Sequence, residues 1–377
     1  MDRKTENALI EELLELKKAD ALHAHDDLHK KTAAQYVGAE QFQLESQLIL
    51  QKLPQAGAHI SELAKAGDFV RRDIGGRSVI ITRNKAGEIK AFLNACRHRG
   101  TRLVDEETGC RHRFSCPYHA WTYDNDGSLI GAPHFDAGFA DIEKSELSLI
   151  RLPCQVVFGL VWVIADPNSS DDIGHFFADV EEDLTALNLD DMVIAAQDKS
   201  QRAANWKIIV EGGIEAYHFR VAHRKTIGPY FEDNLSTYQM LGPHIRSVLA
   251  RPSLADLPSQ NQKNWRLRDH ANILYSLFPT TNFLVQSDHV VWITQTPLAP
   301  NKTKLRIATL VPKSDLAQHD HWQKSHAITI KTLDEDFDIG ESIQENLDAG
   351  AVHELIFGRF EGALTKFSET VQRFLEK

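Results

Sequence analysis

Two short segments of cysteine and histidine constrain this chain more than any other feature. One reads Cys96-Arg97-His98-Arg99-Gly100 and the other Cys116-Pro117-Tyr118-His119, and residues 99–115 separate His98 from Cys116. Each segment supplies one thiolate and one imidazole, which are side chains that hold transition metals in proteins. Because two loops that share a metal centre must lie side by side, the sequence predicts a fold that brings these loops together.

Two kinds of centre use two cysteines and two histidines. In a Rieske [2Fe–2S] cluster two histidines hold one iron and two cysteines the other, which raises the reduction potential and suits the cluster to relay electrons. A zinc site uses the same residue types but more often groups each pair by type. Each loop here carries one residue of each type, so we favour the Rieske cluster, with the ligands Cys96, His98, Cys116 and His119.

Length and composition are those of a globular protein with more than one domain. At 377 residues the chain is too long for a Rieske module alone. The net charge of −11 argues against general binding of nucleic acid, and the absence of a run of 18 apolar residues predicts no membrane-spanning helix. The first residues lack the apolar stretch of a secretory signal. We therefore expect a cytoplasmic protein in which Cys110 and Cys154 are plain buried thiols.

The residue pattern predicts an α+β protein in three parts. Apolar residues between positions 9 and 16 recur at helical spacing, so residues 1–44 are expected to form an N-terminal helical segment. Short β-like runs around both metal loops predict a β domain over 45–165, followed by a second domain over 166–377. In the second domain, residues 272–278, 290–296 and 305–311 are expected to be neighbouring antiparallel strands, and 360–374 an amphipathic helix. No Gly-rich nucleotide fingerprint follows a predicted strand, so we expect neither NAD nor a flavin on the chain.

A second metal site is predicted in the second domain. His218 and His223 are five residues apart, which places them about 140° apart on an ideal helix, so the helix must end or unwind between them if both are to reach one ion. Two histidines and one carboxylate form the facial triad of non-haem Fe(II) oxygenases, which leaves coordination positions open for O2 and substrate.

Helical phase selects the carboxylate among the acids of the segment 334–338. Asp336 shares a predicted buried stripe with three apolar residues that follow it by three, seven and eleven positions, namely Ile339, Ile343 and Leu347. Asp338 lies about 200° from Asp336 and should face solvent. Asp334 is expected to cap or precede the helix, and Glu335 fits the same solvated helix start, stabilised by the helix dipole. Asp336 is therefore the predicted third ligand.

Together the two motifs resemble the oxygenase α subunit of the Rieske non-haem iron oxygenases, also called aromatic-ring-hydroxylating dioxygenases. The resemblance runs over about residues 45–350. Its strongest portions are 94–100, 116–123, 205–207, 215–218, 335–336 and Gln344. It implies that the two Cys/His loops bind the [2Fe–2S] cluster and that His218, His223 and Asp336 bind a mononuclear Fe(II). It also implies a helix-grip (START-like) catalytic domain, in which an antiparallel sheet wraps around a long helix.

The resemblance also implies an acid that links the two metal centres. In that family electrons cross the interface of a head-to-tail homotrimer, through an acid just before the first iron histidine, which is Glu215 here, with His119 as the cluster partner. Glutamate at this position is similar to the branch of choline- and carnitine-type oxygenases. Asn205 and Tyr217 are expected near the same route. The Gly212-Gly213 pair costs about 1 kcal/mol per glycine inside a helix, and close packing near the iron would account for it.

The activity implied is that of a terminal oxygenase. Such a protein uses O2 and electrons from a separate NAD(P)H-dependent reductase, with or without a ferredoxin, to hydroxylate a small organic substrate. Ring dihydroxylation by a dioxygenase and C–H hydroxylation with dealkylation by a monooxygenase both stay open, and a quaternary amine is one substrate class. Two alternatives are a Rieske-type electron-transfer protein and a zinc-stabilised protein that binds a hydrophobic ligand. Six aromatic residues between positions 225 and 300 are available to line a substrate pocket: Tyr230, Phe231, Tyr238, Phe278, Phe283 and Trp292.

Overall fold

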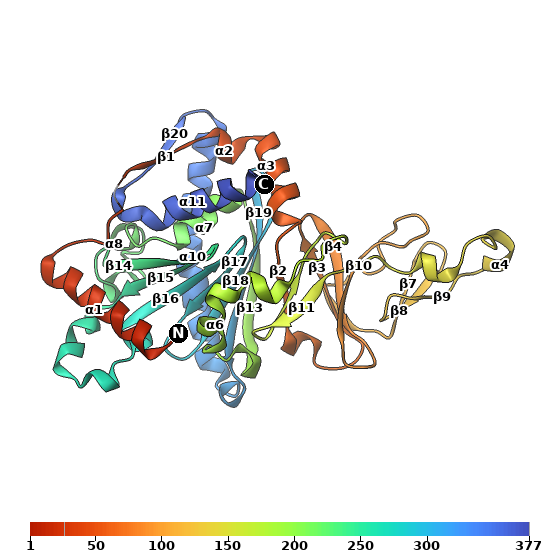
Figure 1. The fold of residues 1–377 in the computed structure, drawn as a ribbon, viewed down its shortest axis with the longest axis horizontal. Helices are drawn as coiled ribbons and strands as arrows, with labels where there is room; N and C mark the ends of the chain where they lie inside the picture. The colour runs from red at the N-terminus through yellow and green to blue at the C-terminus, as the bar shows by residue number, and fades with distance from the viewer. Residues whose placement is uncertain (26, 377) are drawn as a thin grey trace. The chain divides into compact units, whose positions relative to one another are not determined.

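The structure of this chain is a computed structural model that describes residues 1–25 and 27–376 (Figure 1). Asp26 and Lys377, which fall within the predicted domains 1–44 and 166–377, lie outside the described residues. The chain divides into two compact units. The small unit comprises Leu50–Ala178, and the large unit joins Met1–Ile49 to Asp179–Lys377. The first 49 residues therefore belong to the same unit as the C-terminal half.

The small unit is built from three antiparallel sheets. A five-stranded sheet has the order β10-β5-β4-β3-β6, and two three-stranded sheets have the orders β11-β12-β2 and β7-β8-β9. The strands are β2 (Gln55–His59), β3 (Asp68–Ile74), β4 (Arg77–Arg83), β5 (Ile89–Leu93), β6 (Thr108–Cys110), β7 (Arg113–Ser115), β8 (Thr122–Asp124), β9 (Leu129–Gly131), β10 (Arg151–Leu152), β11 (Cys154–Val157) and β12 (Leu160–Val163). The unit also contains two short α-helices, α4 (Phe135–Gly138) and α5 (Ile173–Phe176), besides short 3-10 turns. The predicted β character of this region is confirmed.

Two clusters of buried side chains hold the small unit together. One fills the space between β2, β3, β4 and β12 and includes Val70, Ile81 and Val161. The other lies beneath the predicted metal loops and contains Cys96 and Cys116 among aromatic residues such as Trp121. Because both cysteines pack within this buried cluster, the cluster holds the two loops in position.

The large unit contains one seven-stranded antiparallel sheet with the order β13-β19-β18-β17-β16-β15-β14. Its strands are β13 (Met192–Arg202), β14 (Ser236–Leu241), β15 (His244–Ala250), β16 (Ala271–Leu277), β17 (Thr281–Val285), β18 (Val290–Ala299) and β19 (Lys302–Pro312). Three of these match the predicted strands, but β16 and β18 are not neighbours because β17 lies between them. The sequence pattern missed β17, a short strand whose residues are mostly buried and do not alternate clearly between polar and apolar.

A helix of 30 residues, α10 (His319–Asp348), packs against this sheet (Figure 1). Phe337 of α10 lies in a buried cluster with Val291, Ile293, Leu305 and Ile307 of the sheet. The acids 334–338 therefore lie in the middle of α10, and the expectation that Asp334 and Glu335 stand at the start of a helix is wrong. Fifteen residues of α10 precede this segment, and their polar composition concealed them from the apolar pattern.

The first residues extend the large unit. Helix α1 (Arg3–Ala19) buries Leu9, Ile10 and Leu13 and begins at Asp2, whose side chain accepts a hydrogen bond from the Thr5 N–H. This confirms the predicted opening helix. The segment also contains β1 (His29–Thr32), α2 (Ala34–Val37) and α3 (Ala39–Glu45). Strand β1 pairs with β20 (Glu354–Phe357), so the N-terminal segment is not only helical.

The large unit has five further α-helices among its described residues, of which α7, α9 and α11 contact the sheet. They are α6 (Glu181–Thr185), α7 (Trp206–Gly213), α8 (Phe219–Ala222), α9 (Leu267–His270) and α11 (Gly362–Leu375). Helix α11 buries Leu364, Phe367 and Val371 as the apolar spacing predicts, whereas Phe360 precedes its first residue. An antiparallel sheet against one long helix is the predicted helix-grip arrangement, and the α+β class is confirmed. Within the part of the chain that the structure describes, no helix is both long and apolar enough to cross a bilayer.

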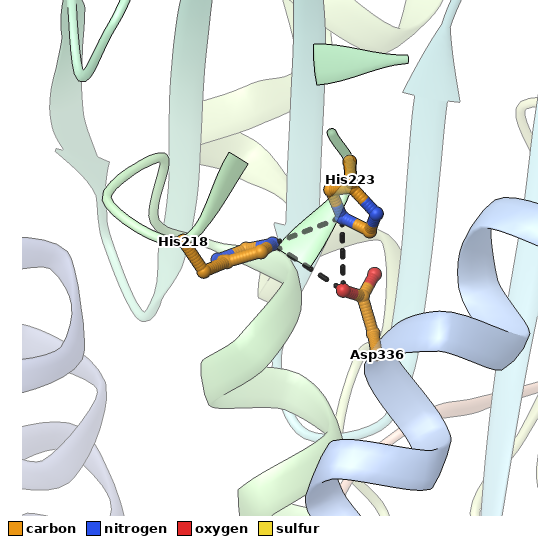
Figure 2. Close-up of side chains that lie close together, drawn as sticks. All are labelled: His218, His223 and Asp336. Atoms are coloured by element: carbon orange, nitrogen blue, oxygen red, sulfur yellow. Dashed lines mark hydrogen bonds and ion pairs between the residues drawn. The ribbon is translucent and has the colours of Figure 1, made fainter. Parts of the chain in front are cut away.

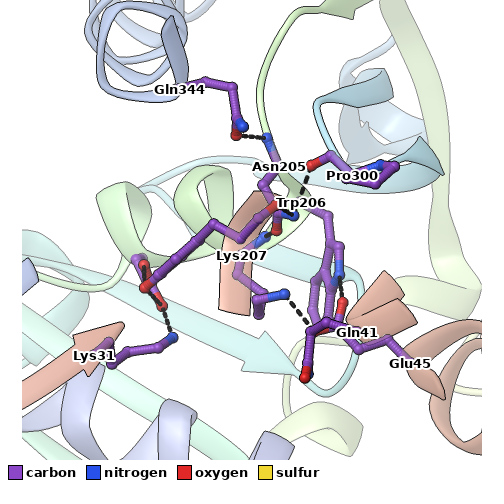
Figure 3. A network of polar contacts seen from close by, with 10 residues as sticks. Lys31, Gln41, Glu45, Asn205, Trp206, Lys207, Pro300 and Gln344 are labelled. Carbon is purple, nitrogen blue, oxygen red and sulfur yellow. Dashed lines mark hydrogen bonds and ion pairs between the residues drawn. The ribbon is translucent and has the colours of Figure 1, made fainter. Parts of the chain in front are cut away.

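Helix α7 leads to the predicted second metal site, and it is buried on nearly all sides. Its two charged residues are paired with the N-terminal segment: Lys207 with Glu45, and Glu211 with Lys31 at 2.8 Å (Figure 3). The hydroxyl of Tyr36 also donates to Glu211, at 2.8 Å. Burial lowers the pKa of Lys207 against the opposing effect of Glu45. A buried charge is tolerated only when it is paired and hydrogen-bonded, so residues 31–45 fix where α7 lies.

Candidate metal centres

His218 and His223 come from the two ends of the four-residue helix α8. Helix α7 ends at Gly213, the chain runs irregularly to residue 217, and His218 then precedes α8 as its N-cap while His223 follows as its C-cap. No single helix carries both histidines, as their spacing of five residues requires. The loop between α7 and α8 is therefore what allows both imidazoles to face one point.

The explanation predicted for Gly212-Gly213 is wrong. A Cβ added at Gly212 would meet no atom within 4 Å, and one at Gly213 would meet only an amide nitrogen at 3.8 Å. Close packing does not demand these glycines. They occupy the last two positions of α7, where a poor helix former helps the helix to end before His218.

Asp336 of α10 completes a compact triad with the two histidines (Figure 2). Its Oδ1 lies 2.9 Å from His223 Nε2 and 3.3 Å from His218 Nε2, and the two Nε2 atoms are 3.2 Å apart. His223 is almost fully buried, and about a fifth of the His218 side chain is exposed. Three side chains from two distant segments thus point their ligand atoms at one another.

These separations fit one transition-metal ion. Ligand atoms at about 2.1 Å from an ion and about 90° apart lie about 3 Å from each other. The three measured separations all lie near this value, as they would on one face of an octahedron. Two imidazoles and one carboxylate can therefore hold an ion from one side and leave the opposite side open.

Each imidazole has a carboxylate next to its Nδ1 atom, and this contact orients the ring so that Nε2 faces the triad. Nδ1 of His218 pairs with Glu215, and Nδ1 of His223 lies 2.8 Å from Glu335 Oε2, which also accepts from the Thr226 hydroxyl at 2.6 Å. A proton on each Nδ1 gives the tautomer whose Nε2 lone pair faces the triad. Both histidines therefore present the nitrogen that a metal needs.

The negative charge of the site also calls for a cation. Burial alone lowers the pKa of His218, but hydrogen bonds to Asp336 and Glu215 outweigh it and raise that pKa to about 10. The pKa of His223 is raised in the same way, by Asp336 and then Glu335, against the effect of burial. Three carboxylates around two imidazoles thus attract positive charge, which a divalent ion provides.

Glu335 and Thr226 are the site residues that the sequence analysis missed. Glu335 was expected in a solvated helix start, but its carboxylate pairs with the His223 imidazole. It follows Thr332 by less than one helical turn, and Thr332 lies on the face of α10 that lines a cavity. Asp334 and Asp338 instead pair with Arg202 of β13. Asp338 is 71% exposed, so its predicted solvent-facing position is confirmed. Only the packing of α10 against α8 distinguishes Glu335 from these neighbours.

The predicted buried stripe around Asp336 is only partly buried. Leu347 is buried, but Ile339 and Ile343 are 46% and 37% exposed. They share a face of α10 with Asp336, since all three line one cavity of about 420 Å³. Asp336 therefore lies on the same helix face as Ile339 and Ile343, as helical phase predicts, but part of that face borders a cavity instead of the core.

The two Cys/His loops of the small unit have the same backbone structure. In one loop the N–H of Gly100 donates to Cys96 O, and the N–H of Cys96 donates to Thr101 O, both at 2.8 Å. In the other loop Ala120 donates to Cys116 O at 3.0 Å and Cys116 to Trp121 O at 2.7 Å. Gly100 and Ala120 both have positive φ. Two equivalent turns thus present their cysteines in equivalent ways.

The side chains of these loops converge as a [2Fe–2S] cluster requires. The thiols of Cys96 and Cys116 are buried next to each other, and the rings of His98 and His119 have centroids 4.7 Å apart. The Tyr123 hydroxyl lies 3.4 Å from Cys96 Sγ. His119 is exposed. Buried sulfurs and an outward-facing imidazole fit a cluster that exchanges electrons at a surface.

The two other cysteines differ in burial from the expectation. Cys154 is about half-buried, whereas Cys110 is exposed. Cys110 is therefore not a buried thiol. It stands on β6, at the edge of the five-stranded sheet, where one side of the strand has no neighbour within that sheet.

Asn205 and Tyr217, both expected near the electron route, lie at opposite ends of the segment that begins with α7. The Asn205 side chain caps α7, accepting from the Lys207 N–H and donating to the carbonyls of Tyr36 and Pro300, while its own N–H donates to Gln344 (Figure 3). These contacts position the start of α7. Tyr217 is 56% exposed, and its N–H donates to Glu215. Of the two, Tyr217 is the residue beside the triad.

Comparison with known families agrees with both centres. Residues 54–151 match the family described as "Rieske [2Fe-2S] domain", and residues 189–377 match "Ring hydroxylating alpha subunit (catalytic domain)". The chain therefore has a domain of the type that carries a [2Fe–2S] cluster and a domain of the type that binds mononuclear iron.

Curated relatives are oxygenase subunits. The chain is 34% identical to the carnitine monooxygenase oxygenase subunit of Escherichia coli (strain K12) over 205 residues, which are 53% of this chain and 52% of the relative. It is 30% identical to the glycine betaine monooxygenase oxygenase subunit of Pseudomonas aeruginosa (strain UCBPP-PA14) over 216 residues, 57% of this chain and 49% of the relative. The chain thus spans about half the length of the curated relatives it matches.

Solved structures share the fold over nearly the whole chain. A quaternary ammonium Rieske monooxygenase aligns with a TM-score of 0.80 at 24% identity and covers 91% of this chain and 94% of its own. Naphthalene 1,2-dioxygenase from Rhodococcus sp. aligns with a TM-score of 0.78 at 20% identity, covering 98% of each chain. Since the catalytic-domain match spans half of the sequence and follows a Rieske match, this chain belongs to the ring-hydroxylating α subunits of the Rieske non-haem iron oxygenases.

Proposed function

We propose that this chain is the terminal oxygenase component of a Rieske oxygenase system, which hydroxylates a small organic substrate with O2. The observation that carries the proposal is the presence, on one chain, of a triad of two histidines and one aspartate together with a pair of Cys/His loops. Electrons come from a separate NAD(P)H-dependent reductase, with or without a ferredoxin. Iron at the triad supplies the centre at which O2 is activated, and the [2Fe–2S] cluster supplies electrons one at a time.

Residues of the large unit would hold the mononuclear iron. His218 and His223 would offer their Nε2 atoms and Asp336 its carboxylate. Glu215 and Glu335 each accept a hydrogen bond from an Nδ1–H and thereby fix the ring orientations. In the small unit Cys96, Cys116, His98 and His119 would hold the cluster.

Glu215 is proposed to connect the two centres across copies of the chain in a head-to-tail homotrimer. Its carboxylate accepts from the N–H groups of Tyr217 and His218 and from His218 Nδ1. A carboxylate has about four acceptor positions, so one stays available for His119 of a neighbouring copy. A cavity of about 420 Å³ lies beside Glu215, and Tyr217 at its border is exposed. A heterologous contact of this kind closes into a ring.

The names of the relatives suggest which substrate classes to test first. Those named above are called carnitine and glycine betaine monooxygenase subunits, while an Acinetobacter relative is called the large subunit of anthranilate 1,2-dioxygenase. We propose that this chain, too, oxidises a small amine or arene, with a quaternary amine as the first class to test.

Metal analysis of protein purified without oxygen tests the proposal. We expect the two irons of the cluster plus one further iron per chain, with visible Rieske absorption. His218→Ala should lose the further iron and substrate-dependent O2 consumption but keep the visible spectrum. His319→Ala, which removes an exposed histidine at the start of α10, is the matched control and should change neither.

Other outcomes point to the alternatives. Colourless protein that contains zinc would identify a zinc-stabilised binding protein. A coloured protein with only the two cluster irons, and no O2 consumption with quaternary amines or arenes, would identify an electron-transfer protein.

A further inference from the structure

The large unit contains a cavity of about 550 Å³ between the sheet and α10. Its α10 wall is formed by residues that repeat at three and four positions, which place them on one helix face: Ser325, Ile328, Thr329, Thr332 and Leu333. The next position on this face is Asp336 of the triad. The cavity therefore runs along α10, from about one turn before Asp336 at Thr332 to about three turns before it at Ser325.

Arg251 brings a positive charge into this cavity. No aspartate or glutamate is among the lining residues, and His289, the other titratable base there, is paired with Asp288 at 2.6 Å. Burial lowers the pKa of the His289 imidazole, although Asp288 opposes this effect. Among the described residues no carboxylate lies within ion-pair distance of Arg251. Burial lowers the pKa of Arg251, while Asp269 and Asp288 oppose this effect from beyond ion-pair distance. Among the residues that line the cavity, Arg251 therefore carries the permanent positive charge, and it has no carboxylate paired with it.

The guanidinium is held in place but is not saturated. Its Nη2 donates to Asn272 Oδ1 at 2.5 Å and to Gln286 Oε1 at 3.1 Å, and the group lies 5.8 Å from the centre of the Phe231 ring. In the part of the chain that the structure describes, Nε and Nη1 have no hydrogen-bond partner. Arginine has five N–H donors in a planar fork that matches a carboxylate, so three of them remain for a ligand.

The contacts of Arg251 place it at the end of the cavity that is remote from the triad. Gln286, which holds the guanidinium, pairs through its N–H with His289 O at 2.9 Å in the turn between β17 and β18. His289 Nε2 lies 3.4 Å from Ser325 Oγ, at the Ser325 end of the α10 wall. Ser325 and Asp336 are about 16 Å apart along the helix. Across the cavity the path is lined by rings, because the Phe231 ring that faces Arg251 lies 5.3 Å from the Phe219 ring, which lies 5.2 Å from that of His223.

On the basis of the function proposed above, we propose that the substrate carries a carboxylate, which Arg251 binds at the remote end of this cavity, and that the carbon to be oxidised lies at the other end, next to Asp336. Tyr230 and Phe231 are the two predicted pocket aromatics that line the cavity, and they provide apolar walls between these ends. The other four predicted aromatics lie elsewhere: Tyr238, Phe278, Phe283 and Trp292 are not among the lining residues.

Calorimetric binding to the iron-loaded, oxygen-free protein tests this inference. The probes are 4-(trimethylammonio)butanoate, glycine betaine, benzoate and 3-phenylpropanoate, each compared with its uncharged carboxamide. At least one carboxylate should bind tenfold or more tightly than its amide. Equal affinity within every pair, or no binding of any carboxylate, would overturn the inference.

Two variants and a control identify the residue responsible. Arg251→Gln should weaken carboxylate binding at least tenfold and leave amide binding unchanged. Gln286→Glu should do the same while keeping the arginine, because the introduced carboxylate next to Nη2 competes with the ligand, and this near-isosteric change preserves the fold. Arg266→Gln, which removes an exposed arginine outside the cavity, should have no effect. Undiminished carboxylate binding in both Arg251→Gln and Gln286→Glu would overturn the assignment.

The readout separates this inference from the proposed function. Substrate-dependent O2 consumption without a preference for carboxylates over amides would contradict the role of Arg251 and leave the oxygenase function standing. Selective carboxylate binding by a protein that never consumes O2 would do the reverse.

Discussion

Glu335 fixes the orientation of His223 through a single hydrogen bond. Its Oε2 lies 2.8 Å from His223 Nδ1 and is itself held by the Thr226 hydroxyl. Glu335→Gln keeps the shape but removes the charge and can reverse the polarity of this hydrogen bond. We expect iron affinity or turnover to fall by about 10–100-fold, as for other residues behind metal ligands. Iron analysis and O2 consumption measure the effect, with the cluster spectrum unchanged.

Asp338→Asn is the matched control for Glu335→Gln. Asp338 lies three positions further on the same helix, is largely exposed and pairs with Arg202. This variant should retain iron and activity. If both variants lost iron equally, the effect would come from the charge of α10 as a whole and not from the contact with His223.

Asn205 is expected to matter for stability more than for chemistry. It is buried, caps α7 and makes hydrogen bonds to two backbone carbonyls. Asn205→Ala should lower the unfolding free energy of the large unit by about 1–2 kcal/mol, seen as a lower melting temperature in calorimetry. Asn261→Ala removes a similar cap from an exposed turn and should cost less. A normal melting temperature with slower electron transfer from the cluster would instead favour the role near the electron route.

At the scale of elements, the turn between β3 and β4 shows how local and tertiary requirements differ. Ile74 pairs with Arg77, so Gly75 and Gly76 alone form the turn, and both have positive φ. Two-residue hairpin turns of type I′ require this conformation at both positions. A Cβ on Gly76 would meet nothing within 4 Å, whereas one on Gly75 would lie 2.6 Å from Leu50 O and 2.8 Å from Ala165 Cβ.

These two glycines should therefore respond differently to substitution. Gly76→Ala should cost about 1–2 kcal/mol, the backbone strain of a left-handed residue. Gly75→Ala should cost more, because it adds a collision with backbone that cannot move aside. Thermal unfolding of the small unit, followed through loss of cluster absorption, compares them. Equal melting temperatures for the two variants would contradict the close approach at Gly75.

At the scale of the whole molecule, the proposed electron route through Glu215 can be tested by mixing defective copies. Cys96→Ser should lack the cluster, and His218→Ala should lack the mononuclear iron, so neither should turn over alone. If the cluster of one copy feeds the iron of the next, co-expressed mixtures should regain activity, because some interfaces pair an intact cluster with an intact iron site.

The mixed preparation needs one further control. Adding Glu215→Ala to the Cys96→Ser copy removes the bridge at the iron site that is still intact, and should abolish the regained activity. Mixtures that stay inactive although they contain both metals would indicate that electrons do not cross between copies.

Local sequence was sufficient to single out both sets of candidate metal ligands. Cys96, His98, Cys116 and His119 stand in short loops, and the spacing of His218 and His223 required the interrupted helix that the structure has. The opening helix, three sheet strands and the C-terminal helix also followed from apolar periodicity, which reports burial along a single element. These features depend on neighbours within a few residues, so the sequence by itself determined them.

Features that depend on distant segments were decided only by the tertiary structure. Glu335 differs from Asp334 and Asp338 only in facing His223, 112 residues away in sequence. Strand β1 pairs with β20 across the whole length of the chain, and Arg251 reaches its cavity through contacts with β16 and the β17–β18 turn. Periodicity shows which side of an element is buried, but it does not show what that side meets, because the partner is chosen by packing of the entire unit.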